Sequence, residues 1–429
     1  MDIREIYRLF SDSSGICLDS RNIIKDSIFI ALHGDNYNAN EFALEAINNG
    51  CSYAVVDEKI YSNDKRIIFV ENSLNTLQEL ALIHRKTFSI PVIALTGTNG
   101  KTNTKELIVS VLKKKYNLTA TIGNLNNHIG LPLTILSINN ETEICIVEMG
   151  ANHLGEIMAL CKIARPEFGL ITNVGKAHLE GFGSFEAIVK TKKELFDYLV
   201  DNKGTLFINT DNKFVKGMYP GRIENTFGTN PDSSITGSII KYDPFLKLEW
   251  LYKTSKNIIN SKLIGSYNFE NIMAAICVGM YFDVNTKDII QGIEEYIPNN
   301  NRSQLLKTEK NTLLLDAYNA NPTSMSSAIN NFLQIKVENK ILILGDMLEL
   351  GTASVEEHKN IIELIIENKF KNVFLVGQLF SELNIPDNFF SFPDTANLIN
   401  YFKSNPPISS TILIKGSRKI GLEKLVELL

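Results

Sequence analysis

Residues 96–102 combine glycine, lysine and hydroxyl side chains in an order that suits phosphate binding. The stretch reads Thr-Gly-Thr-Asn-Gly-Lys-Thr, with an apolar run at 91–95 before it and a helical pattern at 104–115 after it. Glycines let backbone N–H groups converge on an anion, and the start of a helix adds partial positive charge. In such loops the lysine reaches the outer phosphates and the last hydroxyl holds magnesium. The sequence therefore predicts a nucleotide-phosphate loop, made of Gly97, Thr98, Asn99, Gly100, Lys101 and Thr102.

The loop is shorter than the common phosphate-loop motif. Two residues, not four, separate Gly97 from the Gly-Lys-Thr triplet. The alternative interpretation is a glycine turn that binds no ligand. The strand and helix patterns on either side favour the phosphate loop, because they are the context that the motif requires.

Two more polar side chains follow strand patterns. Glu148 comes after an apolar run at 143–147, and His178 lies in the loop after a run at 169–171. Carboxyl ends of parallel strands meet at one sheet edge, so both side chains are expected near the phosphate loop. A carboxylate there is suited to magnesium. A lone histidine is usually structural, but the shared edge favours a second metal ligand.

Composition limits the class of protein. The chain has 429 residues, of which 44% are hydrophobic and 21% charged, which indicates several globular domains. A net charge of −5 gives no support for nucleic-acid binding. The five cysteines are scattered and predict reduced core residues of a cytoplasmic protein. No apolar stretch is long enough for a membrane span.

Alternating strand and helix patterns predict an α/β protein of three domains. We expect a small N-terminal α/β domain at 1–85 and a central domain with a mostly parallel sheet at 86–298, with an antiparallel ribbon at 233–262. A turn-rich stretch at 298–301 predicts a linker. Four regularly spaced strand patterns then predict a Rossmann-like, doubly wound sheet at 299–429.

Several polar loops are candidate binding segments. Ser20 and Arg21 suit a diphosphate or a ribose, although a solvated turn is the commoner interpretation. The uncharged loop that contains Asn124, Asn126 and Asn127 offers amide groups to a polar substrate.

The start of a helical pattern and the last domain add further candidates. Asn271, in the first turn of a helix, is either a cap or a reader of an adenine edge. Asp316 follows a strand and could accept hydrogen bonds from ribose hydroxyls, while Arg302 could reach a phosphate.

Several blocks together resemble the Mur ligase family. They are residues 96–102 with Glu148, the Asn-Val-Gly-x-Ala-His block that ends at His178, and the Tyr-Asn-x-x-Asn block at 267–271. In the last domain, Asp-Ala-Tyr-Asn-Ala-Asn-Pro at 316–322 and Gly-Asp-Met-Leu-Glu-Leu-Gly at 345–351 resemble the member that adds a dipeptide. The chain departs from the family at Asn103, usually threonine, and at Asn38-Ala39-Asn40, usually Asp-Gly-His.

The resemblance implies an ATP-dependent amide ligase of peptidoglycan synthesis, needed to build the cell wall. ATP would phosphorylate the carboxylate of UDP-N-acetylmuramoyl-tripeptide, and the amine of D-alanyl-D-alanine would attack the acyl phosphate. Residues 1–85 would bind the UDP-substrate, 86–298 the ATP, and 299–429 would complete the ligase. A cytoplasmic monomer is expected.

The resemblance also implies roles for individual residues. Lys101 and two magnesium ions would offset the repulsion between the anionic reactants. Thr102 and Glu148 would hold the first ion, and His178 with a carbamylated Lys192 the second. Neighbouring Lys190 is the competing site of carbamylation, and a solvated lysine face is the ordinary interpretation of this run.

The remaining implied roles concern substrates and nucleotide. Asn124, Asn126 and Asn127 would lie near the tripeptide, and Asn271 would face adenine. Arg302 and Asp316 would contact phosphate and ribose. Tyr318, Asn319 and Asn321 would lie near the nucleotide and the incoming dipeptide.

Three other functions remain open. One is a sister ligase that adds the third amino acid to UDP-N-acetylmuramoyl-dipeptide, and another is a folylpolyglutamate synthetase. The third is a nucleotide-dependent switch, but the chain has no Asn-Lys-x-Asp guanine signature.

Overall fold

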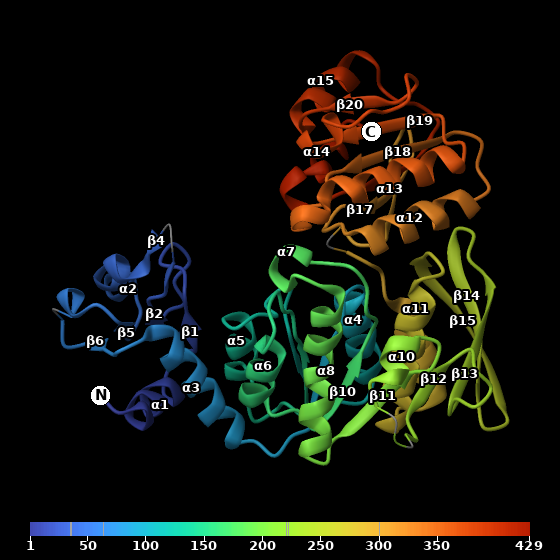
Figure 1. Cartoon of the computed structure of the whole chain (residues 1–429). Helices are drawn as coiled ribbons and strands as arrows, with labels where there is room; N and C mark the ends of the chain where they lie inside the picture. Colours follow the sequence, from blue (N-terminus) through green and yellow to red (C-terminus); the bar gives the residue numbers. More distant parts are fainter. Residues whose placement is uncertain (35–36, 63, 220, 222, 300) are drawn as a thin grey trace.

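The chain forms three main sheets that follow one another in sequence (Figure 1). The computed structural model describes residues 1–34, 37–62, 64–219, 221, 223–299 and 301–429. Asn300, in the predicted linker, lies outside the described residues. Each main sheet is combined with helices, which confirms the α/β class.

The N-terminal sheet is parallel and has the order β1-β2-β5-β6. Its strands are β1 (Ile16–Cys17), β2 (Ile28–Ile30), β5 (Tyr53–Val56) and β6 (Ile67–Phe69), with the helices α1 (Ile3–Ser11), α2 (Ala43–Asn48) and α3 (Ser73–Lys86) and the small ribbon β3 (His33–Gly34) and β4 (Tyr37–Asn38). Phe29 packs in a core with α2, whereas Ile28 and Ile30 face the opposite core with α3. That second core continues into the middle sheet through Val92.

The middle sheet has the order β15-β14-β13-β12-β11-β10-β7-β9-β8. The strands are β7 (Val92–Thr96), β8 (Leu118–Ala120), β9 (Ile144–Glu148), β10 (Phe168–Ile171), β11 (Thr205–Asn209), β12 (Thr226–Gly228), β13 (Ile235–Lys241), β14 (Phe245–Tyr252) and β15 (Ser255–Ile264). Pairing is parallel from β8 to β13 and antiparallel from β13 to β15. The predicted antiparallel ribbon is therefore confirmed.

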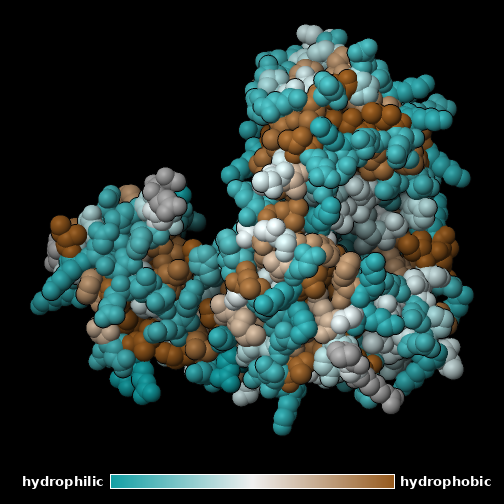
Figure 2. All heavy atoms as spheres, in the orientation of Figure 1, coloured by the Kyte–Doolittle hydropathy of each residue, from teal (hydrophilic) through white to brown (hydrophobic). Residues whose placement is uncertain are grey.

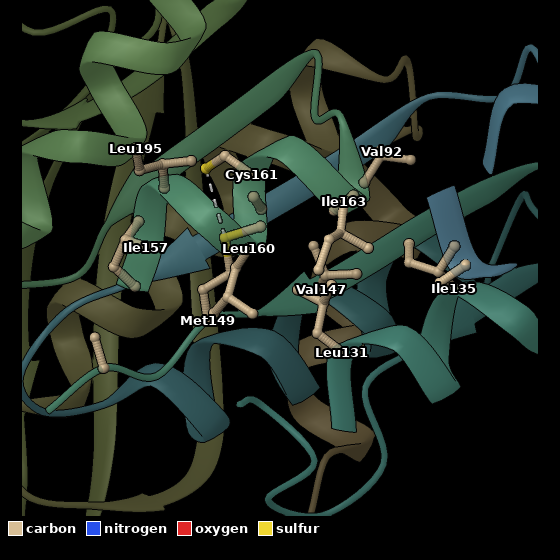
Figure 3. Close-up of a cluster of buried hydrophobic side chains, with 14 of the residues drawn as sticks. Val92, Leu131, Ile135, Val147, Met149, Ile157, Leu160, Cys161, Ile163 and Leu195 are labelled. Atoms are coloured by element: carbon tan, nitrogen blue, oxygen red, sulfur yellow. Dashed lines mark hydrogen bonds between the residues drawn. The ribbon is translucent and has the colours of Figure 1, made fainter. Parts of the chain in front are cut away.

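Helices cover both faces of the middle sheet. They are α4 (Lys101–Leu112), α5 (Gly130–Leu136), α6 (Glu156–Ala164), α7 (Leu179–Phe182), α8 (Phe185–Asp201), α9 (Lys213–Gly217), α10 (Asn268–Tyr281) and α11 (Thr286–Glu295). Val92 and Val147 pack with α5 and α6 on one face, as Figure 3 shows. Ile93 and Ile146 pack with α4 and α10 on the other. This alternation explains why the central strands are apolar on both sides.

The C-terminal sheet has the order β16-β17-β21-β18-β19-β20, parallel except for β16. Its elements are β16 (Gln304–Lys307), β17 (Thr312–Asp316), β18 (Lys340–Gly345), β19 (Asn372–Val376), β20 (Phe390–Phe392), β21 (Thr411–Lys415), α12 (Pro322–Gln334), η3 (Gly351–Ala353), α13 (Ser354–Glu367), α14 (Gln378–Ser381), α15 (Thr395–Ser404), η4 (Arg418–Ile420) and η5 (Leu422–Leu425). Leu314 packs in the core with α12 and α13, while Leu313 packs in the core with α15. The four predicted strands and the doubly wound arrangement are confirmed; the edge strands β16 and β20 were not predicted.

The C-terminal part stands on the middle sheet, and the N-terminal part lies to one side of it (Figure 1). Figure 2 shows a hollow between the N-terminal and C-terminal parts. The predicted boundary after residue 85 falls in the last turn of α3, which packs on α5 and α6. In the described part of the chain, no helix has the length and apolar character needed to cross a membrane.

Candidate nucleotide-binding and ligase site

The phosphate loop connects β7, which lies between β10 and β9 in the central sheet, to α4. Helix α4 begins at Lys101, three residues before the predicted start, so Lys101 and Thr102 lie in its first turn. Gly97 has φ 147° and Gly100 has φ 76°, values that favour glycine. An added Cβ would come within 2.0 Å of Thr172 Oγ1 at Gly97 and within 2.6 Å of Asn271 Oδ1 at Gly100. Glycine is therefore needed at both positions, because a side chain there would clash with Thr172 or Asn271.

The loop after β10 holds the phosphate loop in shape. Asn99 N donates to Asn173 Oδ1 at 2.9 Å, and Thr172 Oγ1 donates to Asn99 O at 2.7 Å. Thr98 Oγ1 accepts from Gly175 N at 3.0 Å. These bonds tie the phosphate loop to the loop after the neighbouring strand and hold its backbone in place.

The Lys101 side chain folds back onto the phosphate loop. Its Nζ donates to Gly97 O at 2.8 Å and to Thr98 O at 3.1 Å. The pKa of Lys101 is lowered, chiefly by burial. The charge of Glu148 opposes this shift, and the charge of Arg302 adds to it. Lys101 therefore lies in the field of a carboxylate from the middle sheet and of a guanidinium from the C-terminal part.

Glu148 occupies the carboxyl end of β9, directly beside β7, where Leu95 is its partner in the sheet. The residue is 1% exposed. Its Oε1 accepts from Asn126 Nδ2 at 2.7 Å, whereas Oε2 is buried and has no hydrogen-bond partner among the described residues. A buried carboxylate oxygen without a partner is costly unless a ligand satisfies it, so this donor set fits a cation.

His178 lies after β10 and caps α7 with a left-handed backbone, at φ 50°. Its Nδ1 is hydrogen-bonded to Oε2 of Glu349, a residue in the loop between β18 and η3. This bond lowers the pKa of Glu349. A loop of the middle part therefore contacts a loop of the C-terminal part at His178, the histidine that was predicted to bind metal.

The two candidate lysines on α8 differ in burial. Lys192 is 3% exposed, and its Nζ lies 5.7 Å from the centre of the Phe182 ring. Burial, with a further contribution from Lys101, lowers the pKa of Lys192 to about 7. Lys190 is exposed. Of the two lysines, Lys192 is therefore the buried one, with a pKa lowered toward neutrality.

The C-terminal part adds an aromatic ring with two cations close to it. The Arg302 guanidinium lies 3.6 Å from the centre of the Tyr318 ring, and that of Arg418 lies 5.1 Å from it. Arg418 Nη1 also donates to Tyr318 Oη at 3.3 Å. Arg302 Nε is buried without a hydrogen-bond partner among the described residues. Such a cluster is suited to an anion or to a stacked base.

The other predicted residues of the C-terminal part lie at the ends of its strands. Asp316 Oδ2 accepts from Lys415 Nζ at 2.6 Å. Asn321 caps α12 and donates from Nδ2 to Asn99 Oδ1 in the phosphate loop at 2.8 Å. Asn319 is exposed, and its carbonyl oxygen accepts from Lys415. Asn321 thus brings the C-terminal sheet directly to the phosphate loop.

Asn271 does not present its amide to an open surface. Its Oδ1 accepts from Thr104 at 3.0 Å, and its Nδ2 donates to Asn268 at 2.8 Å, behind the phosphate loop. In this arrangement Asn271 supports Gly100 and α4. Each amide atom keeps one further hydrogen-bonding position, so the contact with adenine stays a prediction.

The predicted substrate residues are only partly brought together. Asn126 joins the site through Glu148, and Asn127 Oδ1 accepts from Gly130 N, at the start of α5, at 2.9 Å. Asn124 is exposed. Ser20 lies next to Arg21, which forms an exposed ion pair with Asp19 at 2.8 Å in the separate N-terminal part. The sequence alone did not show which of these residues would adjoin the phosphate loop.

Sequence reasoning missed Glu349, Lys415 and Arg418 as site residues. All three lie in loops or strand ends that the pattern had already marked as polar, within 345–351 and 415–418. Their position at or after the carboxyl end of a parallel strand was the signal that could have identified them as site residues. Their partners, His178, Asp316 and Tyr318, could not be inferred because each lies far away in sequence.

Metal-ligating side chains are sparse at the site. Among the described residues, no three of the types His, Cys, Asp and Glu are placed to hold one ion together. The predicted ligands include only two of these types, Glu148 and His178, beside Thr102 and Lys192. The five cysteines are all free and buried, as predicted.

A phosphate loop in a parallel sheet, facing cationic side chains from a second doubly wound sheet, defines a nucleotide-dependent α/β protein of several domains. Family models agree with this class: the Mur ligase middle domain matches residues 95–279, and the Mur ligase, glutamate ligase domain matches residues 301–418. The chain belongs to the Mur ligase family.

Similarity to known relatives runs over nearly the whole chain. It is 32% identical, over 96% of its length and 92% of the relative, to UDP-N-acetylmuramoyl-tripeptide–D-alanyl-D-alanine ligase of Bacillus subtilis. It resembles the structure of MurF from Acinetobacter baumannii at 29% identity and a TM-score of 0.87, covering 96% of this chain and 92% of that one. The MurF ligase from Thermotoga maritima, in complex with ADP, matches at 27% identity and a TM-score of 0.84, with 96% of both chains covered.

Proposed function

We propose that this protein is the ATP-dependent ligase that adds D-alanyl-D-alanine to UDP-N-acetylmuramoyl-tripeptide in peptidoglycan synthesis. The observation that carries the proposal is the 32% identity to a relative of this name, over 96% of the chain. Because the match includes the N-terminal part as well as both sheets of the site, it favours this ligase over a protein that shares only the nucleotide-binding core.

In the first step of the reaction an anionic carboxylate must approach the anionic triphosphate of ATP; the peptide bond forms in the second step. An oxygen of the tripeptide carboxylate attacks the γ-phosphorus of ATP, and ADP leaves. The amine of the dipeptide then attacks the acyl carbon, loses a proton and expels phosphate. Side chains do little covalent chemistry in such a reaction, so positioning and charge stabilisation supply most of the catalysis.

The phosphate loop and Lys101 would bind the triphosphate. Their backbone N–H groups and the first turn of α4 attract anions, and Lys101 exchanges its two carbonyl contacts for phosphate oxygens. Arg302 lies in the same electrostatic field as Lys101 and would reach the same anion from the C-terminal sheet. Asp316, held by Lys415, is placed to accept from ribose hydroxyls.

Thr102, Glu148, His178 and Lys192 would hold two magnesium ions, Lys192 after carbamylation. The unpartnered Oε2 of Glu148 and the lowered pKa of Lys192 support this donor set. Bound magnesium would supply positive charge against the phosphates.

Closure of the sheets over the reactants would exclude water from the acyl phosphate. Asn126 would lie near the bound tripeptide. Tyr318, Asn319 and Asn321 would lie near the bound dipeptide. Ser20, Arg21, Asn124 and Asn127 are the candidates for the more distant parts of the UDP-substrate. A cytoplasmic monomer fits substrates that are soluble nucleotide derivatives.

The test is phosphate release from ATP with purified protein and each combination of substrates. We expect release only when UDP-N-acetylmuramoyl-tripeptide and D-alanyl-D-alanine are both present. Running tripeptides that end in lysine and in diaminopimelate identifies the natural one. Release with UDP-N-acetylmuramoyl-dipeptide and a single amino acid would instead support the sister ligase.

A further inference from the structure

Glu349, a residue of the C-terminal part, contacts one of the predicted metal ligands. It is hydrogen-bonded through Oε2 to His178 Nδ1, across the boundary between the two sheets. Sequence patterns gave this glutamate no role, and its own loop lies 171 residues away from the histidine.

The contact is fixed by backbone as well as side chains. Glu180 N donates to Glu349 O at 3.2 Å, and Gly351 lies so near that an added Cβ would be 3.3 Å from Glu180 Cα. His178 and Glu349 both have left-handed backbones, at φ 50° and φ 64°. Non-glycine residues keep this conformation when their surroundings demand it, often at functional sites.

The loop of Glu349 is also anchored inside its own part of the molecule. Leu348 N donates to Ser417 Oγ at 2.9 Å, and Met347 N donates to His358 Nε2 at 3.0 Å. The carboxylate is therefore carried on a supported loop, and its position depends on where the C-terminal sheet sits.

A carboxylate at this place has a defined chemical effect on histidine. When one ring nitrogen donates to a carboxylate, the tautomer and ring orientation are set, and the other nitrogen becomes a better metal ligand. His178 Nε2 has no hydrogen-bond partner among the described residues. It is the nitrogen left for a cation.

We propose that Glu349 is a positioning residue, which orients His178 across the sheet boundary so that the cation site of His178 and Lys192 is complete only when the C-terminal part is docked. The proposal rests on the proposed function, because it assumes that His178 holds a cation. It adds that cation binding and docking of the C-terminal part stabilise each other, as two linked equilibria must.

The test is cation affinity without turnover. Free Mn²⁺ is measured by electron paramagnetic resonance in full-length protein with ADP and bicarbonate, for Glu349→Ala, the isosteric Glu349→Gln and His178→Ala. Glu357→Ala is the matched control, because Glu357 pairs with Lys176 at 2.7 Å across the same boundary and does not contact His178. Thermal unfolding confirms that each variant is folded.

We expect Glu349→Ala to weaken one Mn²⁺ site about tenfold or more. Glu349→Gln should weaken it less, because its amide oxygen still accepts from His178. Glu357→Ala should weaken it much less than Glu349→Ala, because it removes one docking contact but leaves the bond to His178. Adding Glu349→Ala to His178→Ala should cause no further loss, because one residue acts through the other.

Three results would overturn the proposal: unchanged affinity in Glu349→Ala, an equal loss in Glu357→Ala, or losses that multiply in the double variant. The titration needs no ligation substrates. If ligation failed in the unmodified protein, the proposed function would fall while the role of Glu349 in cation binding could still be read.

Discussion

Lys192 illustrates how burial changes the chemistry available to one side chain. On sequence alone it belongs to a run of lysines at 190–193 that would normally face water. In the structure it is 3% exposed, and its pKa falls to about 7, chiefly through burial. Perturbed groups of this kind gather at functional sites, and here the shift coincides with the predicted modification.

Carbamylation of Lys192 should therefore occur near neutral pH. Below about pH 7 the amine is protonated and unreactive, and above it the neutral form dominates, whereas an ordinary lysine needs a pH near 10.5. Titration with ¹³C-labelled carbon dioxide, followed by NMR, should show a carbamate signal that rises through pH 7. The signal should be absent in Lys192→Ala and retained in Lys190→Ala. Full ligase activity in Lys192→Ala would contradict the assigned role.

The same shift sets a pH dependence of stability. Between about pH 7 and 10.5 the unfolded chain binds a proton at Lys192 that the folded chain does not. The contribution of this residue to stability therefore increases with pH through that window.

At the scale of elements, the β7–α4 connection is held in place by its neighbours. Gly97 lies against the loop after β10, and Thr172 fills the space where a side chain would be. The strand, the loop and the following helix are consecutive in sequence, which explains why their arrangement could be predicted from the sequence.

Replacing Gly97 with alanine should distort this connection. The backbone at φ 147° is strained for alanine, and the new Cβ would meet Thr172 Oγ1 at 2.0 Å. We expect a loss of about 1–3 kcal/mol in the free energy of unfolding, measured with denaturant, and a marked loss of nucleotide binding. Gly217→Ala, with open space around it, is the control and should change neither. Normal ATP binding in Gly97→Ala would refute this account of the loop.

Helix α3 joins the N-terminal sheet to the middle one, and Arg85 is one of the residues that hold it there. Arg85 is 4% exposed and donates to Ala164 O at 2.9 Å and to Glu167 Oε1 at 2.6 Å. Arg85→Ala should lower the free energy of unfolding by about 2–4 kcal/mol, since buried carbonyls lose their donors. Arg66→Ala, which breaks a solvent-exposed pair with Asp64, should change the free energy of unfolding far less. Similar losses in both variants would contradict the role of burial.

Sequence patterns predicted the strands, helices and loops better than the contacts between residues far apart in the sequence. The phosphate loop, Glu148 and the four C-terminal strands follow from local order and apolar periodicity. By contrast, the bond from His178 to Glu349 depends on how two sheets dock, and the cluster of Arg302, Tyr318 and Arg418 depends on how the C-terminal part folds. For Asn271 the sequence left open a helix cap or an adenine contact, because both use the same residue type; the structure adds its bonds to Thr104 and Asn268.

At the scale of the whole molecule, two sheets share one candidate site. Asn99 and Asn321, Lys176 and Glu357, and His178 and Glu349 form three polar links between the middle and C-terminal parts. The N-terminal part stands apart across the hollow seen in Figure 2. The arrangement suits an enzyme in which a nucleotide lies between two parts and a long substrate extends to a third.

The most direct test is a crystal structure of the protein with magnesium and a non-hydrolysable ATP analogue. The account predicts that the triphosphate lies along residues 97–102, with Lys101 released from its carbonyl contacts and Arg302 directed to the phosphates. Glu148 and His178 should face the bound magnesium. A triphosphate bound elsewhere, or Glu148 and His178 turned away from it, would contradict the account.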